Sequence, residues 1–462
     1  MKERMLRLQQ VQLNNFKNVR QGQIDFNSYK SEDFFSETSD VLGIYGQNGS
    51  GKTAFIEALW ILKLVLLGES LPGDIKDYIY QGEKEAAINS VFSMTLGENK
   101  YQLFYEMVIE RRENAAPVII KEDLSYKKLE EDGWTYKRGI ITHNLDEKEQ
   151  LLSPQKNYNL LTKNNKDAKV DLKVAKELAK KEQTSFIFSS EMDHIYKGNK
   201  AFSEFADIIM EIKQYARMNL FVIRNSRSGM INANLIIPFC FQLSDSERIE
   251  GGDLAIALSE PTTVPERVLS TVKNVIENLN IVLKEIIPEL TIKIKEYGEE
   301  LDENGDPVIK IELLAERGEI KIPLRYESDG IKKIISILSA MIAMYNKPGI
   351  CLAVDELDAG IFEYLLGEIL EIIQDRAKGQ LVFTSHNLRP LEKLNKESLI
   401  FTTTNPQNRY IRFTNVKETN NLRSFYYRGI KLGGQEEEVY ERTNEYKIAR
   451  AFRAAGRVDA DD

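Results

Sequence analysis

The clearest chemical signal in the sequence is a glycine-rich octapeptide with the spacing G-x-x-x-x-G-K-T, formed by Gly46, Gln47, Asn48, Gly49, Ser50, Gly51, Lys52 and Thr53. It follows an apolar run (41–45) predicted as a strand and begins a helical pattern (52–67). Glycines let backbone N–H groups curl around phosphate oxygens, and the helix N-terminus adds positive charge. Lys52 is then expected to reach the β and γ phosphates, and the Thr53 hydroxyl to bind Mg²⁺. The motif therefore predicts a site for ATP and Mg²⁺.

Two carboxylates follow a second apolar run. Asp355 and Glu356 come directly after residues 350–354. Asp355 could hold Mg²⁺ through water, and Glu356 could orient and deprotonate an attacking water. Such a pair alone also fits a solvated strand end, but its combination with the octapeptide favours catalysis.

Of the three histidines, His386 follows a third apolar run, residues 381–385. If that strand lies beside the Asp355 strand in a parallel sheet, the imidazole stands at the carboxyl edge, where α/β folds bind ligands. It could sense the γ-phosphate. His143 and His194 are interpreted as structural, and neither cysteine lies near a histidine in a metal-binding spacing.

Composition limits the class of protein. The chain has 462 residues, 62 Lys and Arg against 71 Asp and Glu, a net charge of −9 and 42% hydrophobic residues. These values suit two or three domains and exclude wholesale disorder. Cys240 and Cys351 lie in apolar runs and no stretch approaches the ~20 apolar residues that span a bilayer, so we expect a cytoplasmic protein without a membrane segment.

The elements that position these residues form an α/β pattern. Strands are predicted at 6–16 and 19–26, divided by a turn at Asn14 and Asn15, and an antiparallel sheet at 87–96, 101–110, 117–129 and 134–138. After helices at 170–181, 202–218 and 268–287 come strands at 291–296, 308–314 and 319–325. A helix (329–345), the Asp355 strand, a helix (360–376), the His386 strand and a last strand (399–401) complete a mostly parallel sheet.

These elements predict an α/β nucleotide-binding head divided by a helical insertion lobe. The expected units are an N-terminal half of the head (1–143), the insertion lobe (144–288), a C-terminal half of the head (289–415) and a tail (416–462).

The order of motifs resembles the ABC-type ATPases of the SMC, RecF and OLD group, over about residues 1–140 and 290–405. The resemblance implies a P-loop ATPase head that hydrolyses ATP slowly, with Gly46 to Thr53 as its Walker A motif and Asp355 and Glu356 as its Walker B motif. It implies a D-loop that includes Asp358 and a switch histidine at His386. Ser328 and Gly330 match the signature motif, which in this family contacts the nucleotide of the other subunit. A plain helix N-cap remains the alternative for Ser328. The family's Q-loop glutamine has two candidates, Gln81 and Gln102.

The stretches after Asp355 and around His386 look like stand-alone AAA/ABC-hybrid ATPases of bacterial anti-phage operons, including PARIS-like and abortive-infection systems. OLD nucleases also resemble the chain, but the residues after 401 are too few for their nuclease domain. The resemblance therefore implies a homo-oligomer, a dimer or larger, that controls a nuclease or toxin carried by a partner chain, with a phage protein or DNA as trigger. The alternatives are a RecF-like DNA-repair ATPase that binds DNA directly and an ATP-holding scaffold that keeps a toxin inactive.

Two regions could contact a partner or DNA. A basic helix is predicted at 445–457, with Tyr446, Ile448, Ala449 and Phe452 on its apolar side; docking on its own domain is the alternative. The insertion offers several cations, which could equally be solvated: Lys173, Lys176, Lys180, Lys181, Arg217, Arg224 and Arg227.

Overall fold

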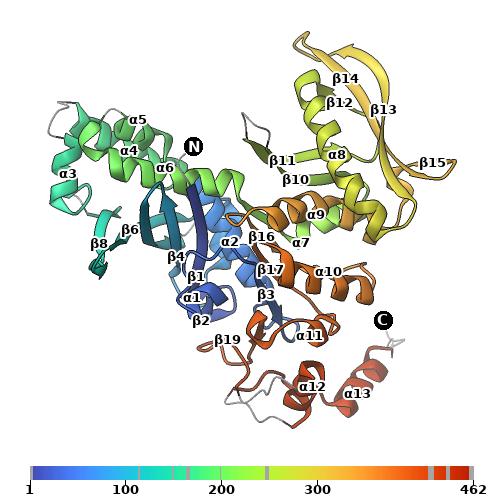
Figure 1. Ribbon diagram of the computed structural model, residues 1–462. Coiled ribbons are helices and arrows are strands. Elements are labelled where there is room, and N and C mark those ends of the chain that lie inside the picture. Colours follow the sequence, from blue (N-terminus) through green and yellow to red (C-terminus); the bar gives the residue numbers. More distant parts are fainter. Residues whose placement is uncertain are drawn as a thin grey trace, which may run out of the picture.

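The computed structural model describes residues 4–112, 115–147, 150–162, 167–197, 199–244, 249–414, 421–432 and 437–456. It contains two large sheets, a smaller sheet and a hairpin, with helices between and around them (Figure 1).

The core is a six-stranded sheet in the order β19-β18-β3-β17-β16-β9. Five of its strands are parallel and β19 is antiparallel at one edge. The strands are β3 (Asp40–Tyr45), β9 (Leu220–Ile223), β16 (Cys351–Val354), β17 (Gln380–Thr384), β18 (Leu399–Thr402) and β19 (Tyr410–Ile411). Apolar side chains bury both faces, as parallel sheets require. The predicted neighbours β16 and β17 are confirmed.

A seven-stranded antiparallel sheet lies beside the core, in the order β2-β1-β4-β5-β6-β7, with β8 also on β6. Its strands are β1 (Arg4–Phe16), β2 (Val19–Asp25), β4 (Glu85–Leu96), β5 (Asn99–Glu110), β6 (Val118–Glu130), β7 (Gly133–Trp134) and β8 (Arg138–Asn144). The helix α2 (Lys52–Leu67) joins the buried apolar cluster of this sheet, and Figure 1 shows it between the two sheets.

Two details of the predicted strands were wrong. The chain turns at Lys17 and Asn18, not at Asn14 and Asn15, because pairing with β2 continues to Phe16. The strand expected at 134–138 is divided between β7 and β8. Thr135 forms two hydrogen bonds with Lys128 of β6 before the chain reaches β8.

Residues 144–288 are not wholly helical, because strands separate the helices of their first part from a long helix at Glu266–Ile286, which confirms the helix predicted at 268–287. The helices of the first part are α3 (Gln155–Thr162), α4 (Ala168–Glu182), α5 (Ser190–Lys197) and α6 (Ser203–Met218). The next strand, β9, pairs in parallel with β16 and so forms an edge of the core sheet. Its four apolar residues are too short a signal to separate from the helical pattern before them. After α7 (Asn225–Asn232) comes a hairpin of β10 (Ile236–Ser244) and β11 (Ile249–Ala257).

A four-stranded sheet follows, in the order β12-β14-β13, with β15 also on β14. It contains β12 (Thr262–Pro265), β13 (Leu290–Leu301), β14 (Pro307–Arg317) and β15 (Ile320–Pro323). The helices α8 (Glu266–Ile286) and α9 (Asp329–Asn346) share the buried apolar cluster of this sheet with β16 and β17.

The remaining helices are α1 (Asn27–Lys30), α10 (Glu363–Arg376), α11 (Pro390–Lys393), α12 (Leu422–Leu432) and α13 (Glu445–Ala455). Short three-ten turns lie at Gly73–Tyr78, Lys200–Phe202, Leu324–Tyr326 and Lys396–Ser398. No helix in the described ranges has the length and apolar character needed to cross a bilayer.

One buried carboxylate joins the antiparallel sheet to the segment between α4 and α5. Glu122 of β6 accepts hydrogen bonds from the Tyr105 hydroxyl (2.7 Å), the Ser185 hydroxyl (2.5 Å) and the Phe186 N–H (2.7 Å). Burial raises the pKa of Glu122 above its usual value. The carboxylate therefore satisfies three buried donors at an electrostatic cost.

We predict that Glu122→Ala lowers the free energy of unfolding by about 3 kcal/mol, because it leaves three buried donors without an acceptor. Urea unfolding measures this change. Glu130→Ala, at an exposed position of the same strand, is the control and should cost less than about 0.5 kcal/mol. Equal effects of the two substitutions would contradict a structural role for Glu122.

The same carboxyl group predicts a pH dependence. Because its folded pKa lies above its unfolded value, the folded state binds more protons between the two values, and stability falls as the pH rises through that interval. Glu122→Gln should lack this component of the stability curve. Parent and variant curves that stay parallel from about pH 4 to pH 7 would contradict the prediction.

Candidate functional site

The glycine-rich loop leaves β3 at the carboxyl edge of the core sheet, as the sequence predicts. Gly49 and Gly51 have φ angles of 76° and 101°, which disfavour side chains. A Cβ atom on Gly46 would lie 1.7 Å from the Thr402 hydroxyl oxygen. The loop therefore needs glycine at these three positions for reasons of conformation and space.

A second segment, which the sequence motifs did not reveal, supports the loop from β19. The Tyr410 hydroxyl donates to the Gly51 carbonyl (2.8 Å), and the Arg409 guanidinium donates to the Asn18 carbonyl (2.6 Å). The Asn18 amide in turn donates to the Gly49 carbonyl. These residues lie far from the loop in sequence and follow no recognisable spacing, so only the fold could identify them.

Lys52 lies under the loop with 6% of its surface exposed. Its ammonium donates to the carbonyls of Gly46 (2.7 Å) and Gln47 (3.1 Å). Burial lowers the pKa of Lys52, and the nearby carboxylates, of which Asp355 acts most strongly, partly offset the effect. The loop thus holds a cation where phosphate oxygens would approach.

Asp355 and Thr53 meet where β16 ends. The Thr53 hydroxyl donates to one oxygen of Asp355 (3.3 Å), and the Thr384 hydroxyl donates to the same oxygen (2.6 Å). The other oxygen of Asp355 is buried and has no partner among the described residues. A carboxylate oxygen and a hydroxyl beside a phosphate site are ligands that Mg²⁺ prefers. The pair therefore fits the ion, although the described residues hold no cluster of three or more His, Cys, Asp or Glu side chains suited to a metal.

Glu356 follows in a left-handed conformation (φ 49°), which turns the chain sharply after the strand. Its N–H donates to the Thr384 hydroxyl (2.7 Å), and the buried Lys333 ammonium of α9 donates to its carbonyl. The side chain of Glu356 lines a cavity of about 520 Å³, together with Asn18, Lys52, Thr53, Thr384 and His386. The structure thus brings the predicted base, the lysine and the hydroxyl to one cavity.

His386 lines this cavity and is exposed. Its position depends on Asp358, whose carboxylate accepts the N–H groups of His386 (3.1 Å) and Asn387 (3.0 Å). Asp358 itself does not line the cavity. Within one chain, Asp358 therefore orients the loop that carries His386.

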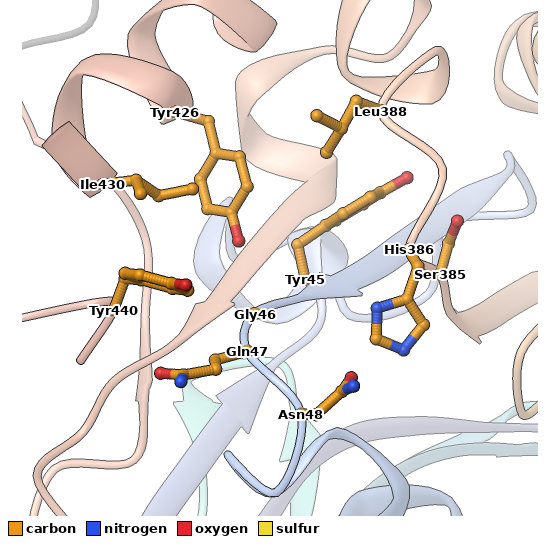
Figure 2. A pocket seen from close by; sticks show the side chains of 10 residues that line it. All are labelled: Tyr45, Gly46, Gln47, Asn48, Ser385, His386, Leu388, Tyr426, Ile430 and Tyr440. Atoms are coloured by element: carbon orange, nitrogen blue, oxygen red, sulfur yellow. The ribbon is translucent and has the colours of Figure 1, made fainter. Parts of the chain in front are cut away.

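A second cavity of about 360 Å³ lies on the other side of Asn48 (Figure 2). Figure 2 shows the rings of Tyr426 and Tyr440 across this space from His386. The Gln47 side chain accepts the Glu441 N–H (3.0 Å) and donates to the Glu441 carbonyl (3.4 Å). The segment before α13 is therefore attached to the phosphate loop itself.

Ser328 and Gly330 do not enter either cavity. The Ser328 hydroxyl accepts the Ile331 N–H (3.4 Å), which is N-cap geometry, and Ser328 is exposed at the start of α9. A Cβ atom on Gly330 would lie 1.8 Å from the Gly360 carbonyl oxygen. The start of α9 thus packs directly on the turn that follows Asp358.

The other two histidines line neither cavity. His143 is buried beside Phe186, where burial lowers its pKa to about 4. His194 is exposed on α5, away from both cavities.

Neither Gln81 nor Gln102 lines the main cavity. Of the predicted basic set, Lys176 is buried and donates to the Asn144 carbonyl (3.3 Å), and Arg224 covers the Trp60 ring at 3.5 Å. The Arg227 side chain and residue 457 lie outside what the structure describes. The exposed members of the set are Lys173, Lys180, Lys181 and Arg217.

A family model for the AAA ATPase domain (AAA_15) matches residues 6–389, which include every element that lines the main cavity. The chain belongs to this ATPase family. It binds ATP and is an ATPase, and its α/β fold is the one that the sequence predicts.

Solved structures similar to this ATPase include SMC head domains. The SmcHead bound to the C-winged helix domain of ScpA has 12% identity and a TM-score of 0.41, with 88% of this chain and 98% of that chain covered. The Smc head domain from Pyrococcus furiosus, with an extended coiled coil and bound to the C-terminal domain of ScpA, has 12% identity, a TM-score of 0.38 and coverage of 89% and 97%. The SMC head domain from Thermotoga maritima has 14% identity, a TM-score of 0.32 and coverage of 88% and 99%. No curated protein matches the sequence.

We predict that Thr384→Val lowers kcat of the ATPase about 10-fold to 100-fold, because its hydroxyl positions both Asp355 and the Glu356 backbone through hydrogen bonds worth about 1.5–3 kcal/mol to a charged group. KM for ATP should change less than threefold, since the lysine and the glycine loop remain. Steady-state phosphate release measures both. Thr384→Ser, which keeps the hydroxyl, is the control; a Ser variant as slow as the Val variant would contradict this role.

Proposed function

We propose that this ATPase is a Mg²⁺-dependent nucleotide switch that closes between two copies of the chain and controls an effector carried by a partner. The observation that carries the proposal is the position of Ser328. It is exposed at the start of α9, outside its own chain's cavity, and its helix is joined to the catalytic turn.

The chain's own cavity supplies one half of the chemistry. Lys52 and the loop N–H groups would bind the β and γ phosphates, and Thr53 and Asp355 would hold Mg²⁺, which neutralises charge on the phosphates when bound. Glu356 would accept a proton from the attacking water, and His386 would contact the γ-phosphate.

The start of α9 would supply the other half to a second copy. A helix N-terminus presents unpaired N–H groups and partial positive charge, which suit a phosphate. The Lys333 ammonium donates a hydrogen bond to the Glu356 carbonyl, and Gly330 packs on Gly360. A phosphate bound at the start of α9 would therefore influence the position of the turn that carries Glu356. ATP would then favour the closed pair, and hydrolysis would release it.

The partner and the setting are proposed from the resemblance of the motifs to anti-phage ATPases. In that setting the closed and open assemblies would differ in their contact with a nuclease or toxin. Direct DNA binding, as in the RecF-like alternative, would instead give an ATP-dependent, salt-sensitive affinity for DNA in the isolated chain.

We predict that Glu356→Gln slows ATP turnover at least about 100-fold, the usual contribution of a general base, and retains ATP in a closed assembly. Phosphate release and mass photometry with Mg²⁺, with and without ATP, measure the two effects.

Glu363→Gln, at an exposed position in the first turn of α10 and outside both cavities, is the matched control and should behave like the parent. Turnover at the parental rate in Glu356→Gln would show that Glu356 is not the base. A mass that does not respond to ATP in either protein would contradict closure between copies.

A further inference from the structure

The helix α13 is exposed to solvent along its whole length. Every residue from Glu445 to Ala455 is exposed, including Tyr446 (76%) and Phe452 (77%). The alternative that its apolar side docks on its own domain is therefore not realised. An isolated helix of 11 residues is marginally stable in water unless its apolar side is buried.

Its side chains are sorted around the helix axis. Ile448, Ala449, Phe452 and Ala455 lie on one side of the helix and form an apolar arc. Arg453 borders one edge of that arc, and Tyr446, Arg450 and Lys447 follow it around the helix. The surface that α13 can offer is thus apolar in the middle and cationic along one side.

A groove of matching chemistry lies between α8, α9 and α10. It is a cavity of about 500 Å³ whose walls are mostly apolar, formed chiefly by Val282, Leu338, Ile342, Leu365, Ile369 and Ile372. Ile372 is 51% exposed, an unusual position for isoleucine. We call this cavity the α8–α10 groove.

The rim of the groove carries negative charge. Glu285 of α8 and Glu368 of α10 both line it and are exposed. In the part of the chain that the structure describes, neither carboxylate forms an ion pair. The groove therefore complements α13 in both respects, apolar at the centre and opposite in charge at the edge.

The helix α13 does not occupy the groove of its own chain, because every one of its residues is exposed. Glu441 is hydrogen-bonded to Gln47 at the carboxyl edge of the core sheet, and only three residues separate it from Glu445, a reach of about 14 Å. The groove runs from the middle of α9 to its last turn and along most of α10. Figure 1 shows α13 beside α12 and apart from α8 and α9.

We propose that α13 of one copy docks in the α8–α10 groove of a second copy. The contact joins two different surfaces, so two copies could exchange α13 reciprocally about a two-fold axis, or repeated copies could form a closed ring or an open chain. It goes beyond the nucleotide switch because neither surface belongs to the ATP cavity, and it requires no bound nucleotide.

Site-specific crosslinking between two differently tagged chains tests the contact. One chain carries Ile448→Cys and the other Ile372→Cys; both positions are exposed, whereas the native Cys240 and Cys351 are buried. A short bismaleimide should link the two chains without ATP. Val174→Cys, on the exposed side of α4, replaces Ile372→Cys in the control and should give at least 10-fold less product.

Absence of the mixed product above the Val174→Cys background would overturn the proposal. So would a chain carrying both cysteines that links only within itself, because α13 would then occupy its own groove. Glu356→Gln should give the parental yield, so a failure of the nucleotide switch does not affect this result.

Reversing the charges gives a second measurement in the absence of nucleotide. Arg450→Glu with Arg453→Glu in one chain should lower the crosslinking yield at least fivefold against an unaltered groove. The yield should return when the groove chain carries Glu285→Lys with Glu368→Lys. Loss without recovery would contradict the proposed charge complementarity, whereas recovery requires that the two surfaces meet.

Discussion

The parallel pairing of β3, β17 and β16 is the constraint on which the rest of the structure depends. The pairing aligns Thr384 with Ile44 and Phe383 with Val354, so the phosphate loop, Thr384 and Asp355 all leave the sheet at one edge. The Thr384 hydroxyl can then bridge Asp355 and the Glu356 N–H, which fixes the two carboxylates relative to Lys52. Without this register the three motifs would be separate features of a long chain.

Contacts behind the site join it to distant segments. The Lys333 ammonium of α9 donates a hydrogen bond to the Glu356 carbonyl, and the Asp358 carboxylate accepts one from the His386 N–H. The Glu441 N–H donates to the Gln47 side chain. Each contact ties a loop of the site to another segment of the chain. Nucleotide binding can therefore influence those segments, and changes in those segments can influence the site.

The sequence predicted most of the fold because the glycine-rich loop, Asp355 and His386 each stand next to a clear strand or helix pattern. The Walker A helix was predicted with its observed bounds, and the strands before Asp355 and His386 were predicted as parallel neighbours. The failures have physical causes. The short strand β9 carries no local signal beyond four apolar residues, because its place at the sheet edge is set by pairing with β16. Arg409 and Tyr410 support the glycine loop from more than 350 residues away in sequence, so no spacing could reveal them. The apolar side of α13 was visible in the sequence, whereas its exposure depends on where the preceding segment is attached.

The central claim is that two copies complete each ATP site, and subunit complementation tests it most directly. Lys52→Ala should abolish phosphate binding in its own cavity, and Ser328→Arg should block the start of α9, so each variant alone should lack ATP turnover. In an equimolar mixture, a pair of unlike chains contains one site with both an intact Lys52 and an intact Ser328. The account predicts that the mixture regains measurable phosphate release that rises with protein concentration. A mixture as inactive as its components, or a Ser328→Arg variant with parental turnover, would contradict it.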